Sequence, residues 1–264
     1  MTDLTKYGPW ALIVGGSEGV GSAFAKQLAA DGFNIVLMAR NAERLEAAAV
    51  DVREAGAEVR TVALDLLADD AIDKLIAATA DIEVGLLILN AGANTYGSEF
   101  VGGDLDKHLQ VLDLNVTRQI PLVHHFAQAM VERGRGGVIL VGSLSGYSGS
   151  DREGIYAASK AFSRIFAEGL WAESKPRGVD VLHLVLGLTR TPAMARKGLN
   201  FDIPGISASD PEAVAAEGLA HLADGPVWIT EGNVEVARAR SSATGRDTLI
   251  LKSIEGIKKI VGKL

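Results

Sequence analysis

The sequence of 264 residues predicts a single α/β domain, a doubly wound parallel sheet of seven strands with helices on both faces. Three observations predict this fold. Short, wholly apolar runs alternate with longer helical patterns, as in successive βαβ units. The apolar runs do not alternate with polar residues, which is typical of parallel strands that are covered on both faces. No repeat, low-complexity run or linker divides the chain into parts.

The elements follow one another in a regular order. We expect strands at residues 10–14, 34–38, 59–64, 84–89, 138–141, 179–185 and 227–229. Helical patterns end at residue 30 and cover about 43–55, 69–79, 104–131 and 156–175. Gly32 is the stop signal of the first helix. Pro121 lies either early in a second segment of the 104–131 stretch or at a kink inside it.

Composition bounds the class of protein. Apolar residues make up 48% and charged residues 22% of the chain, which is ordinary for a soluble globular protein. The absence of cysteine excludes disulfides and thiolate metal sites, and the five histidines show no metal-ligand spacing. A net charge of −7 argues against a nucleic-acid partner. Residues 1–8 lack the apolar core of a secretory signal, and no run approaches the ~20 apolar residues that span a bilayer. We therefore expect a cytoplasmic protein without a metal.

A glycine motif follows the first expected strand. Gly15, Gly19 and Gly21 have the spacing GxxxGxG and open the next helix. Glycines let the backbone come close to a pyrophosphate, and the helix N-terminus offers N–H groups and the positive end of a dipole. A structural tight turn is the alternative, but the strand–turn–helix context favours a Rossmann-type dinucleotide site. The loop residues that would also contribute are Ser17, Glu18 and Val20.

The turn after the second strand predicts which cofactor is bound. An acidic residue there would hydrogen-bond the ribose 2′-hydroxyl of NAD. Arg40 stands in this turn instead, and it suits the 2′-phosphate of NADP(H), although it could also be a solvated turn residue. Asp65 follows the third strand and is placed to meet the adenine, with Leu66 beside it. The fourth strand ends at three small or polar residues that would border the cofactor, Asn90, Ala91 and Gly92.

A second motif lies near the middle of the chain. Tyr156 and Lys160 are four residues apart and therefore share one face of a helix. A nearby ammonium lowers a phenol pKa from about 10, and such a phenol can exchange a proton with an alcohol oxygen. Ser143 ends the fifth strand, and its hydroxyl could hydrogen-bond the same oxygen. Alone, the Tyr–Lys pair could be accidental and Ser143 one serine among several, but the independent glycine motif favours a catalytic site.

With both motifs present, the chain resembles the short-chain dehydrogenase/reductase family over residues 8–235. The features that carry the resemblance are the glycine motif, the Asn-Ala-Gly of residues 90–92, Asn115 in a helix, Ser143, and the Tyr-x-x-x-Lys of Tyr156 and Lys160. The resemblance implies that Tyr156 is the acid/base, Lys160 holds the nicotinamide ribose and Ser143 polarises the substrate oxygen. Asn115 would anchor a water in a proton relay, or else be a buried asparagine at a helix bend.

The resemblance also covers the segment after the sixth strand. It implies that the nicotinamide carboxamide is met by Gly187, Thr189 and Thr191. The sequence departs from the family at three positions, which are Val14 in place of threonine, Leu89 in place of the first of two asparagines, and Leu186 in place of proline. None of these would touch the reacting atoms, so we expect at most a slight effect on cofactor affinity.

Residues 6–11 and 32–41 are similar to a narrower group, the 17β-hydroxysteroid dehydrogenases and very-long-chain 3-oxoacyl-CoA reductases, whose membrane anchor is absent here. This similarity indicates a hydrophobic ketone or secondary alcohol as substrate. The expected reaction is the NADP(H)-dependent interconversion of a ketone or aldehyde with an alcohol. The alternatives are a non-catalytic NADP(H)-binding regulator on the same fold, and a reductase of imines or activated alkenes.

Two segments stand outside the strand–helix rhythm. Residues 193–209 are expected as a loop on the side where open α/β sheets bind ligands, either a lid over the substrate or an ordinary surface loop. Their apolar side chains would suit a steroid, acyl or aromatic ketone and are Met194, Leu199, Phe201, Ile203 and Ile206. Residues 248–264 carry an apolar stripe among lysines, which could lie on a membrane surface. Docking on its own domain or on a neighbouring subunit is favoured.

The family resemblance further implies a homodimer or homotetramer. Family members usually pair through the helices that match residues 104–131 and 156–175.

Overall fold

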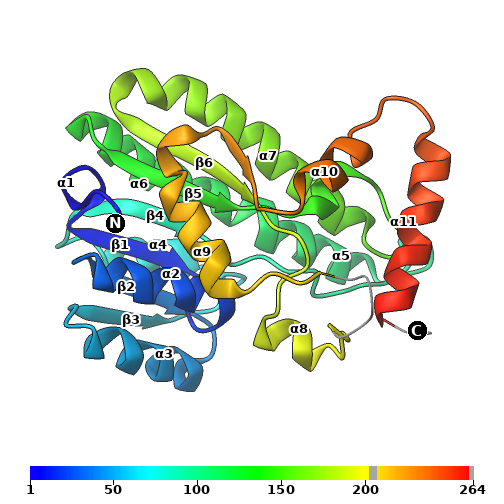
Figure 1. Cartoon of the computed structure of the whole chain (residues 1–264). Coiled ribbons are helices and arrows are strands. Elements are labelled where there is room, and N and C mark those ends of the chain that lie inside the picture. The colour runs from blue at the N-terminus through cyan, green and yellow to red at the C-terminus, as the bar shows by residue number, and fades with distance from the viewer. Residues whose placement is uncertain (202–206, 262–264) are drawn as a thin grey trace.

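In the computed structural model, seven strands form one parallel sheet with helices on both faces, as the sequence predicts (Figure 1). The structure describes residues 1–201 and 207–261. The strands are β1 (Trp10–Val14), β2 (Asn34–Ala39), β3 (Val59–Ala63), β4 (Val84–Leu89), β5 (Gly136–Val141), β6 (Val179–Val185) and β7 (Val227–Ile229). Their order is β3-β2-β1-β4-β5-β6-β7, so the direction of winding reverses between β1 and β4. Ligands of doubly wound sheets bind outside the carboxyl ends of the strands at such a reversal.

The sheet is the core of the molecule. Every residue of β1, β4, β5 and β6 is buried, as expected for parallel strands between two helical layers. In the register of the central strands, Val14 pairs with both Met38 and Leu89, and Leu89 pairs with Leu140. The strands therefore end at one level. The turns that carry the predicted site residues meet at a single edge of the sheet.

Helices cover the two faces of the sheet separately (Figure 1). One apolar cluster joins the sheet to α2 (Gly19–Ala30), α3 (Ala42–Glu54) and α9 (Pro211–Ala220). The other joins it to α4 (Ala71–Ala77), α6 (Gln119–Arg133) and α7 (Gly154–Ser174). The remaining helices are α1 (Leu4–Tyr7), α5 (Leu105–Leu112), α8 (Pro192–Arg196), α10 (Val234–Arg240) and α11 (Arg246–Val261). Among the described helices, none has both the length and the apolarity that crossing a membrane requires.

The long helical stretch predicted at 104–131 consists of two helices. A π-helical turn, Asp113–Thr117, separates α5 from α6, and Pro121 lies in the first turn of α6. Proline is tolerated there because the first N–H groups of a helix have no intrahelical acceptor. Of the two predicted positions for Pro121, the one early in the second segment is correct.

The segment predicted as a loop at 193–209 contains a helix, so that expectation was wrong in part. Thr191 caps α8 by accepting a hydrogen bond from the backbone N–H of Met194 (3.3 Å), and Pro192 is the first helical residue. The same signal, Asp210 followed by Pro211, begins α9, which was not predicted. Ile203 and Ile206 lie outside the described residues.

The C-terminal segment forms α11, in agreement with its helical apolar stripe. This helix lies beyond α5 and α10, on the side where the strands end (Figure 1). Arg246, at its start, donates hydrogen bonds to the carbonyl oxygens of Arg240 (2.5 Å) and Tyr147 (3.4 Å). The N-terminal end of the predicted tail is therefore attached to its own chain. Residues 262–264 lie outside the described residues.

Candidate active site

The turn after β1 needs glycine at two positions. Gly15 has a φ of +91°, and a Cβ there would lie 2.6 Å from the backbone nitrogen of Ala91. A Cβ at Gly21 would lie 2.1 Å from the carbonyl oxygen of Gly15. The turn leads into α2, where the N-cap residue Glu18 makes no side-chain capping hydrogen bond. The first N–H groups of α2 therefore keep the donor capacity that phosphate sites use.

Asn90 holds the end of β4 against this turn. Its side-chain amide donates to the carbonyl oxygen of Gly15 (2.7 Å), and its backbone N–H donates to that of Val14 (2.9 Å). The N–H of Ala91 also donates to Val14, at 2.6 Å. Val14 lacks the hydroxyl usual in the family, but the Asn90 amide already steadies the turn. Asn90 thus acts on the glycine turn directly, and its spacing in the sequence could not reveal this contact.

Charged residues gather beside the turn after β2. Arg40 is three-quarters exposed, and its Nη1 lies 3.8 Å from Oδ2 of Asp65. Arg44, in the first turn of α3, lies 3.9 Å from Oε2 of Glu18. Sequence reasoning did not select Arg44, although its four-residue distance from Arg40 was a signal. Leu66 packs in the core with 3% of its surface exposed, so only its backbone borders this region.

The three predicted catalytic side chains come together at the ends of β5 and α7. Lys160 is 5% exposed and donates a hydrogen bond to the carbonyl oxygen of Val141 (3.0 Å). Its Nζ lies 5.7 Å from the centre of the Tyr156 ring. The hydroxyl of Ser143 accepts a hydrogen bond from the N–H of Ser145 (3.1 Å), which fixes its place after β5. Strand β5 and helix α7 thus position all three.

Burial dominates the electrostatics of this group. It raises the pKa of Tyr156 to about 12, against the opposite effect of a hydrogen bond with Ser143, and the charge of Glu153 raises it further. Burial also lowers the pKa of Lys160 to about 8. The sequence-based expectation that Lys160 lowers the tyrosine pKa was wrong for this structure. The ammonium donates to the Val141 carbonyl, and loss of solvent outweighs its effect on the phenol.

Asn115 lies in the π-helical turn with 2% of its surface exposed. Its amide donates to the carbonyl oxygens of Val111 (2.8 Å) and Ala93 (3.1 Å). Its own Oδ1 is buried without a hydrogen-bond partner among the described residues. A Cβ on Gly92 would lie 2.6 Å from this oxygen and 3.1 Å from Nζ of Lys160. The missing side chain of Gly92 is what lets Asn115 and Lys160 approach each other.

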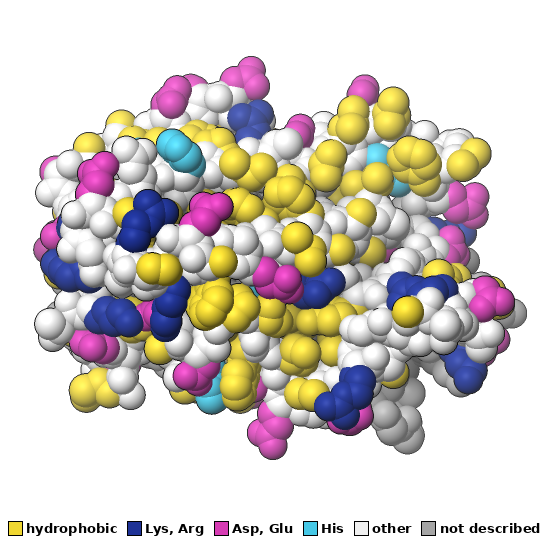
Figure 2. All heavy atoms as spheres, turned by 90° about the horizontal axis from the view of Figure 1, so that it is seen from above, with side chains coloured by type: hydrophobic (Ala, Val, Ile, Leu, Met, Phe, Trp, Pro, Cys, Tyr) yellow, Lys and Arg dark blue, Asp and Glu magenta, His cyan; other side chains and the backbone are white. Residues whose placement is uncertain are grey.

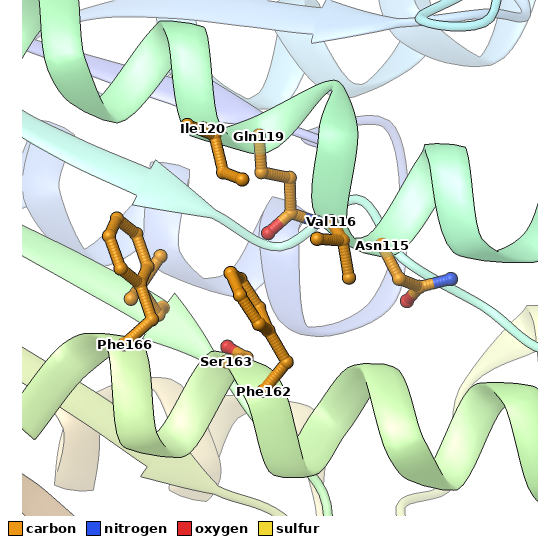
Figure 3. A pocket seen from close by; sticks show the side chains of 8 residues that line it. Asn115, Val116, Gln119, Ile120, Phe162, Ser163 and Phe166 are labelled. Atoms are coloured by element: carbon orange, nitrogen blue, oxygen red, sulfur yellow. The ribbon is translucent and has the colours of Figure 1, made fainter.

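A small pocket lies beside Asn115, between the π-helical turn with α6 and helix α7 (Figure 3). Phe162 and Phe166 of α7 lie on one side of it, and Gln119 and Ile120 lie on the other (Figure 3). Gln119 donates to the carbonyl oxygen of Ala91 (2.7 Å), so it supports the end of β4 from behind. The pocket therefore adjoins the site from the side of α6 and α7.

The segment after β6 lies opposite the glycine turn. Thr189 is 6% exposed and donates a hydrogen bond to the carbonyl oxygen of Gly187 (3.2 Å). A Cβ on Gly19 would lie 3.0 Å from Cγ2 of Thr191. A Cβ on Gly187 would lie 2.2 Å from Oδ1 of Asn233, a neighbour that sequence reasoning did not foresee. Gly19 and Thr191 thus bring the two halves of the sheet edge into contact.

Helix α8 is attached to both sides of this edge, which the sequence did not predict. Arg196 donates to both carboxylate oxygens of Glu18, one of them at 2.9 Å. Lys197 donates to the carbonyl oxygen of Asn94 (2.5 Å), in the loop that follows β4. Glu18, predicted as a cofactor contact, therefore uses its carboxylate to hold α8 and approaches Arg44. Only its backbone remains for a ligand.

Comparison with known proteins agrees with this geometry. The chain matches the family described as short chain dehydrogenase over residues 9–200. A 7beta-hydroxysteroid dehydrogenase of Collinsella aerofaciens is 35% identical over 190 residues, which are 72% of each chain. A very-long-chain 3-oxoacyl-CoA reductase of Neurospora crassa is 34% identical over 203 residues, 74% of this chain and 61% of the relative.

Solved structures show the same likeness. A structure from work on 7beta-hydroxysteroid dehydrogenase stereoselectivity has a TM-score of 0.87 at 30% identity and covers 96% of this chain and 99% of its own. A short-chain dehydrogenase from Sphingobium yanoikuyae in complex with NADPH has a TM-score of 0.77 at 27% identity, with 95% of each chain covered. A doubly wound sheet with this site defines a class of dinucleotide-dependent oxidoreductases. The chain belongs to the short-chain dehydrogenase family, whose members bind nicotinamide cofactors, and the predicted resemblance is confirmed.

The lowered pKa of Lys160 predicts a change in stability with pH. Its pKa is about 8 in the folded protein, well below its ordinary value, so between pH 8 and 10 the unfolded chain binds more protons than the folded one. Stability from this group therefore rises with pH across that window. We expect the wild type to gain about 2 kcal/mol over a Lys160→Met variant between pH 8 and pH 10. Urea unfolding followed by circular dichroism measures this difference.

The exposed Lys74→Met variant is the control for loss of a surface ammonium. If the wild-type and Lys160→Met stabilities change in parallel between pH 8 and 10, the Lys160 amine is not desolvated.

Proposed function

We propose that the protein is an NADP(H)-dependent oxidoreductase that interconverts a ketone or aldehyde with an alcohol. One observation carries the proposal. Ser143 and Tyr156 interact through their hydroxyls, with Lys160 buried beside them, on the same edge of the sheet as the glycine turn. No other group of described side chains combines a hydrogen-bonded phenol with a buried amine in this way.

The residues present fit a dinucleotide. The N-terminus of α2 has no side-chain cap, glycines line the turn before it, and Oδ1 of Asn115 is a buried acceptor without a partner among the described residues. When bound, NADPH would supply the hydride. Residues of the β1 and β4 turns would hold its pyrophosphate and ribose. Lys160 would hold the nicotinamide ribose, and Gly187, Thr189 and Thr191 would border the carboxamide.

The chain's own residues would move the proton. Negative charge develops on the carbonyl oxygen during reduction, and Ser143 and Tyr156 are placed to donate hydrogen bonds to it. A phenol whose pKa is raised to about 12 keeps its proton at neutral pH, which is the state a general acid requires. This supports reduction as the direction that the site favours. Asn115 would hold a water through Oδ1, which would link Lys160 with the solvent.

The Tyr156→Phe variant tests the proton transfer. We expect kcat for carbonyl reduction to fall by at least about a hundredfold, because general acid catalysis contributes that much or more. The Kd for NADPH should change little, since only the hydroxyl is removed. Turnover is followed at the NADPH absorbance with a panel of ketones and aldehydes, and binding by NADPH fluorescence. Undiminished turnover would remove Tyr156 from the mechanism, and a wild type inactive on the whole panel would favour a non-catalytic regulator.

The preference for NADP(H) is supported by the charges near the β2 turn. Arg40 is exposed there, and Arg44 in the first turn of α3 supplies a second cation on the same side. A 2′-phosphate between two guanidinium groups would be held by charge-assisted hydrogen bonds. The NADPH complex of the Sphingobium yanoikuyae relative is in keeping with this choice.

The Arg40→Ala variant tests this preference. We expect kcat/KM for NADPH to fall by about 10- to 100-fold, the loss of one hydrogen-bonded charge, while kcat/KM for NADH stays within a factor of about three. Steady-state kinetics with the two cofactors side by side measure the ratio. Arg53→Ala at the other end of α3 is the matched control. An equal fall with both cofactors would assign Arg40 a structural role instead.

The relatives and the lining of α8 support a bulky, mainly apolar substrate. The two relatives act on a hydroxysteroid and on a very-long-chain 3-oxoacyl-CoA, as their names state. Helix α8 and the residues after it contribute Met194, Leu199 and Phe201 on the same side of the sheet. We therefore propose a secondary alcohol or ketone with an apolar body as the substrate.

We also propose that the protein is a homodimer through α5, α6 and α7. Hydrophobic side chains gather on the face that carries α7 (Figure 2). Exposed apolar residues of the three helices are Leu105, Leu109, Ile120, Phe162 and Ile165, with exposures of 58%, 47%, 38%, 41% and 56%. Contiguous apolar surface of this kind marks an interface. Two copies related by a two-fold axis would cover it with the same patch from each.

A charge in the centre of this face tests the dimer. We expect Ile165→Glu to shift the protein from dimer to monomer, because an unpaired carboxylate would be buried in the interface. Light scattering after size-exclusion chromatography measures the mass. Val50→Glu on α3 is the matched control, since Val50 is exposed to a similar degree (47%) on another helix. A wild type that is monomeric, or an Ile165→Glu protein of unchanged mass, would contradict the proposal.

A further inference from the structure

Four segments bring polar side chains together next to Tyr156. Glu153 is the N-cap residue of α7, and Asn94 lies in the loop after β4. Lys197 ends α8, and Arg240 ends α10. The glycine turn contributes nothing to this group. It therefore belongs to the substrate side of the site rather than to the cofactor side.

Glu153 is the member that faces the reacting group. It precedes Tyr156 by three residues, so the two side chains are neighbours on the first turn of α7. Its charge acts on the Tyr156 hydroxyl strongly enough to raise the pKa of that phenol. Burial raises the pKa of Glu153 itself, against the opposite effects of Asn94, Lys197 and Arg240. The carboxyl is thus partly withdrawn from water beside the place of reaction.

The two cations are held by backbone carbonyls rather than by Glu153. Lys197 donates to the carbonyl oxygen of Asn94 (2.5 Å), and Arg240 donates to that of Leu144 (3.1 Å). Neither forms an ion pair with Glu153 in the part of the chain that the structure describes. A carboxyl group has room for about four hydrogen bonds, and the Asn94 amide supplies one. Glu153 therefore keeps acceptor capacity beside Tyr156.

The surrounding charges decide what can use that capacity. An ammonium group on a substrate would be repelled by Lys197 and Arg240, and an anionic group would be repelled by Glu153 itself. A neutral donor meets neither objection. A wholly apolar ketone would cover the carboxyl without replacing its hydrogen bonds to water, which is unfavourable. The donor that fits is a hydroxyl group.

We propose that Glu153 is a specificity-determining residue that accepts a hydrogen bond from a substrate hydroxyl one to three carbons from the carbonyl. The substrate class is then the hydroxyketones and the diols that correspond to them, within an otherwise apolar molecule. This inference rests on the proposed function, since it concerns the substrate of the same site. A site built to bind a hydroxyl discriminates against an analogue that lacks it far more than an apolar pocket discriminates between methylene groups.

Matched ketones test the inference. The substrates are 2-octanone, 1-hydroxy-2-octanone and 4-hydroxy-2-octanone, with NADPH as cofactor. We expect the wild type to prefer one of the hydroxyketones by at least about tenfold in kcat/KM. Glu153→Leu should remove this preference by raising kcat/KM for 2-octanone and lowering it for the hydroxyketone. Glu153→Gln, which keeps an acceptor oxygen, should retain part of it. Glu173→Gln, on the same helix and exposed, is the control and should match the wild type.

The outcomes separate this inference from the proposed function. If the wild type and Glu153→Leu turn over all three ketones with the same relative kcat/KM, Glu153 does not read a hydroxyl, while the carbonyl reductase activity stands. If the wild type prefers 2-octanone, the inference is likewise overturned. If no ketone is reduced by any variant although NADPH binds, the proposed function fails, and the inference fails with it.

Discussion

The contact between the ends of β1 and β4 determines where the rest of the site can lie. The carbonyl oxygen of Val14 accepts hydrogen bonds from the N–H groups of both Asn90 and Ala91, at 2.9 and 2.6 Å. The Asn90 amide then reaches Gly15, which turns away from the sheet with a positive φ. This is the point where the winding of the sheet reverses, so the two adjoining turns diverge and leave an opening between them. Everything that binds or reacts must sit at this opening.

Small residues extend the same contact inward. Gly21 packs on the carbonyl of Gly15, and Gly92 leaves room for Asn115 and Lys160. A side chain at either place would push apart the elements that carry the polar groups. The π-helical turn between α5 and α6 directs Asn115 toward Gly92, and its Oδ1 remains without a partner among the described residues. A buried carbonyl oxygen in that condition is costly, and such groups are often kept for function.

Burial sets the protonation of the reacting groups. It raises the pKa of Tyr156 and lowers that of Lys160, so the phenol holds its proton more firmly and the amine less firmly than in water. Outside this pair, the charged residues of the site act mainly as structural links. Glu18 joins the glycine turn to Arg196 of α8, and Lys197 joins α8 to the loop after β4. Helix α8 is thus held on both sides of the opening, next to the Glu153 group.

The sequence by itself determined the strands, their parallel arrangement and the residues of the two motifs, because apolar runs and glycine spacing are local signals. It also identified Ser143, Tyr156 and Lys160, which share one helix and one strand end. The tertiary structure alone decided how Glu18 is used, why Asn90 matters to the turn, and that Glu153 meets residues of three other segments. It also decided the sign of the tyrosine pKa shift. Such features depend on burial and on contacts between segments far apart in the chain, and neither leaves a pattern in the order of residues.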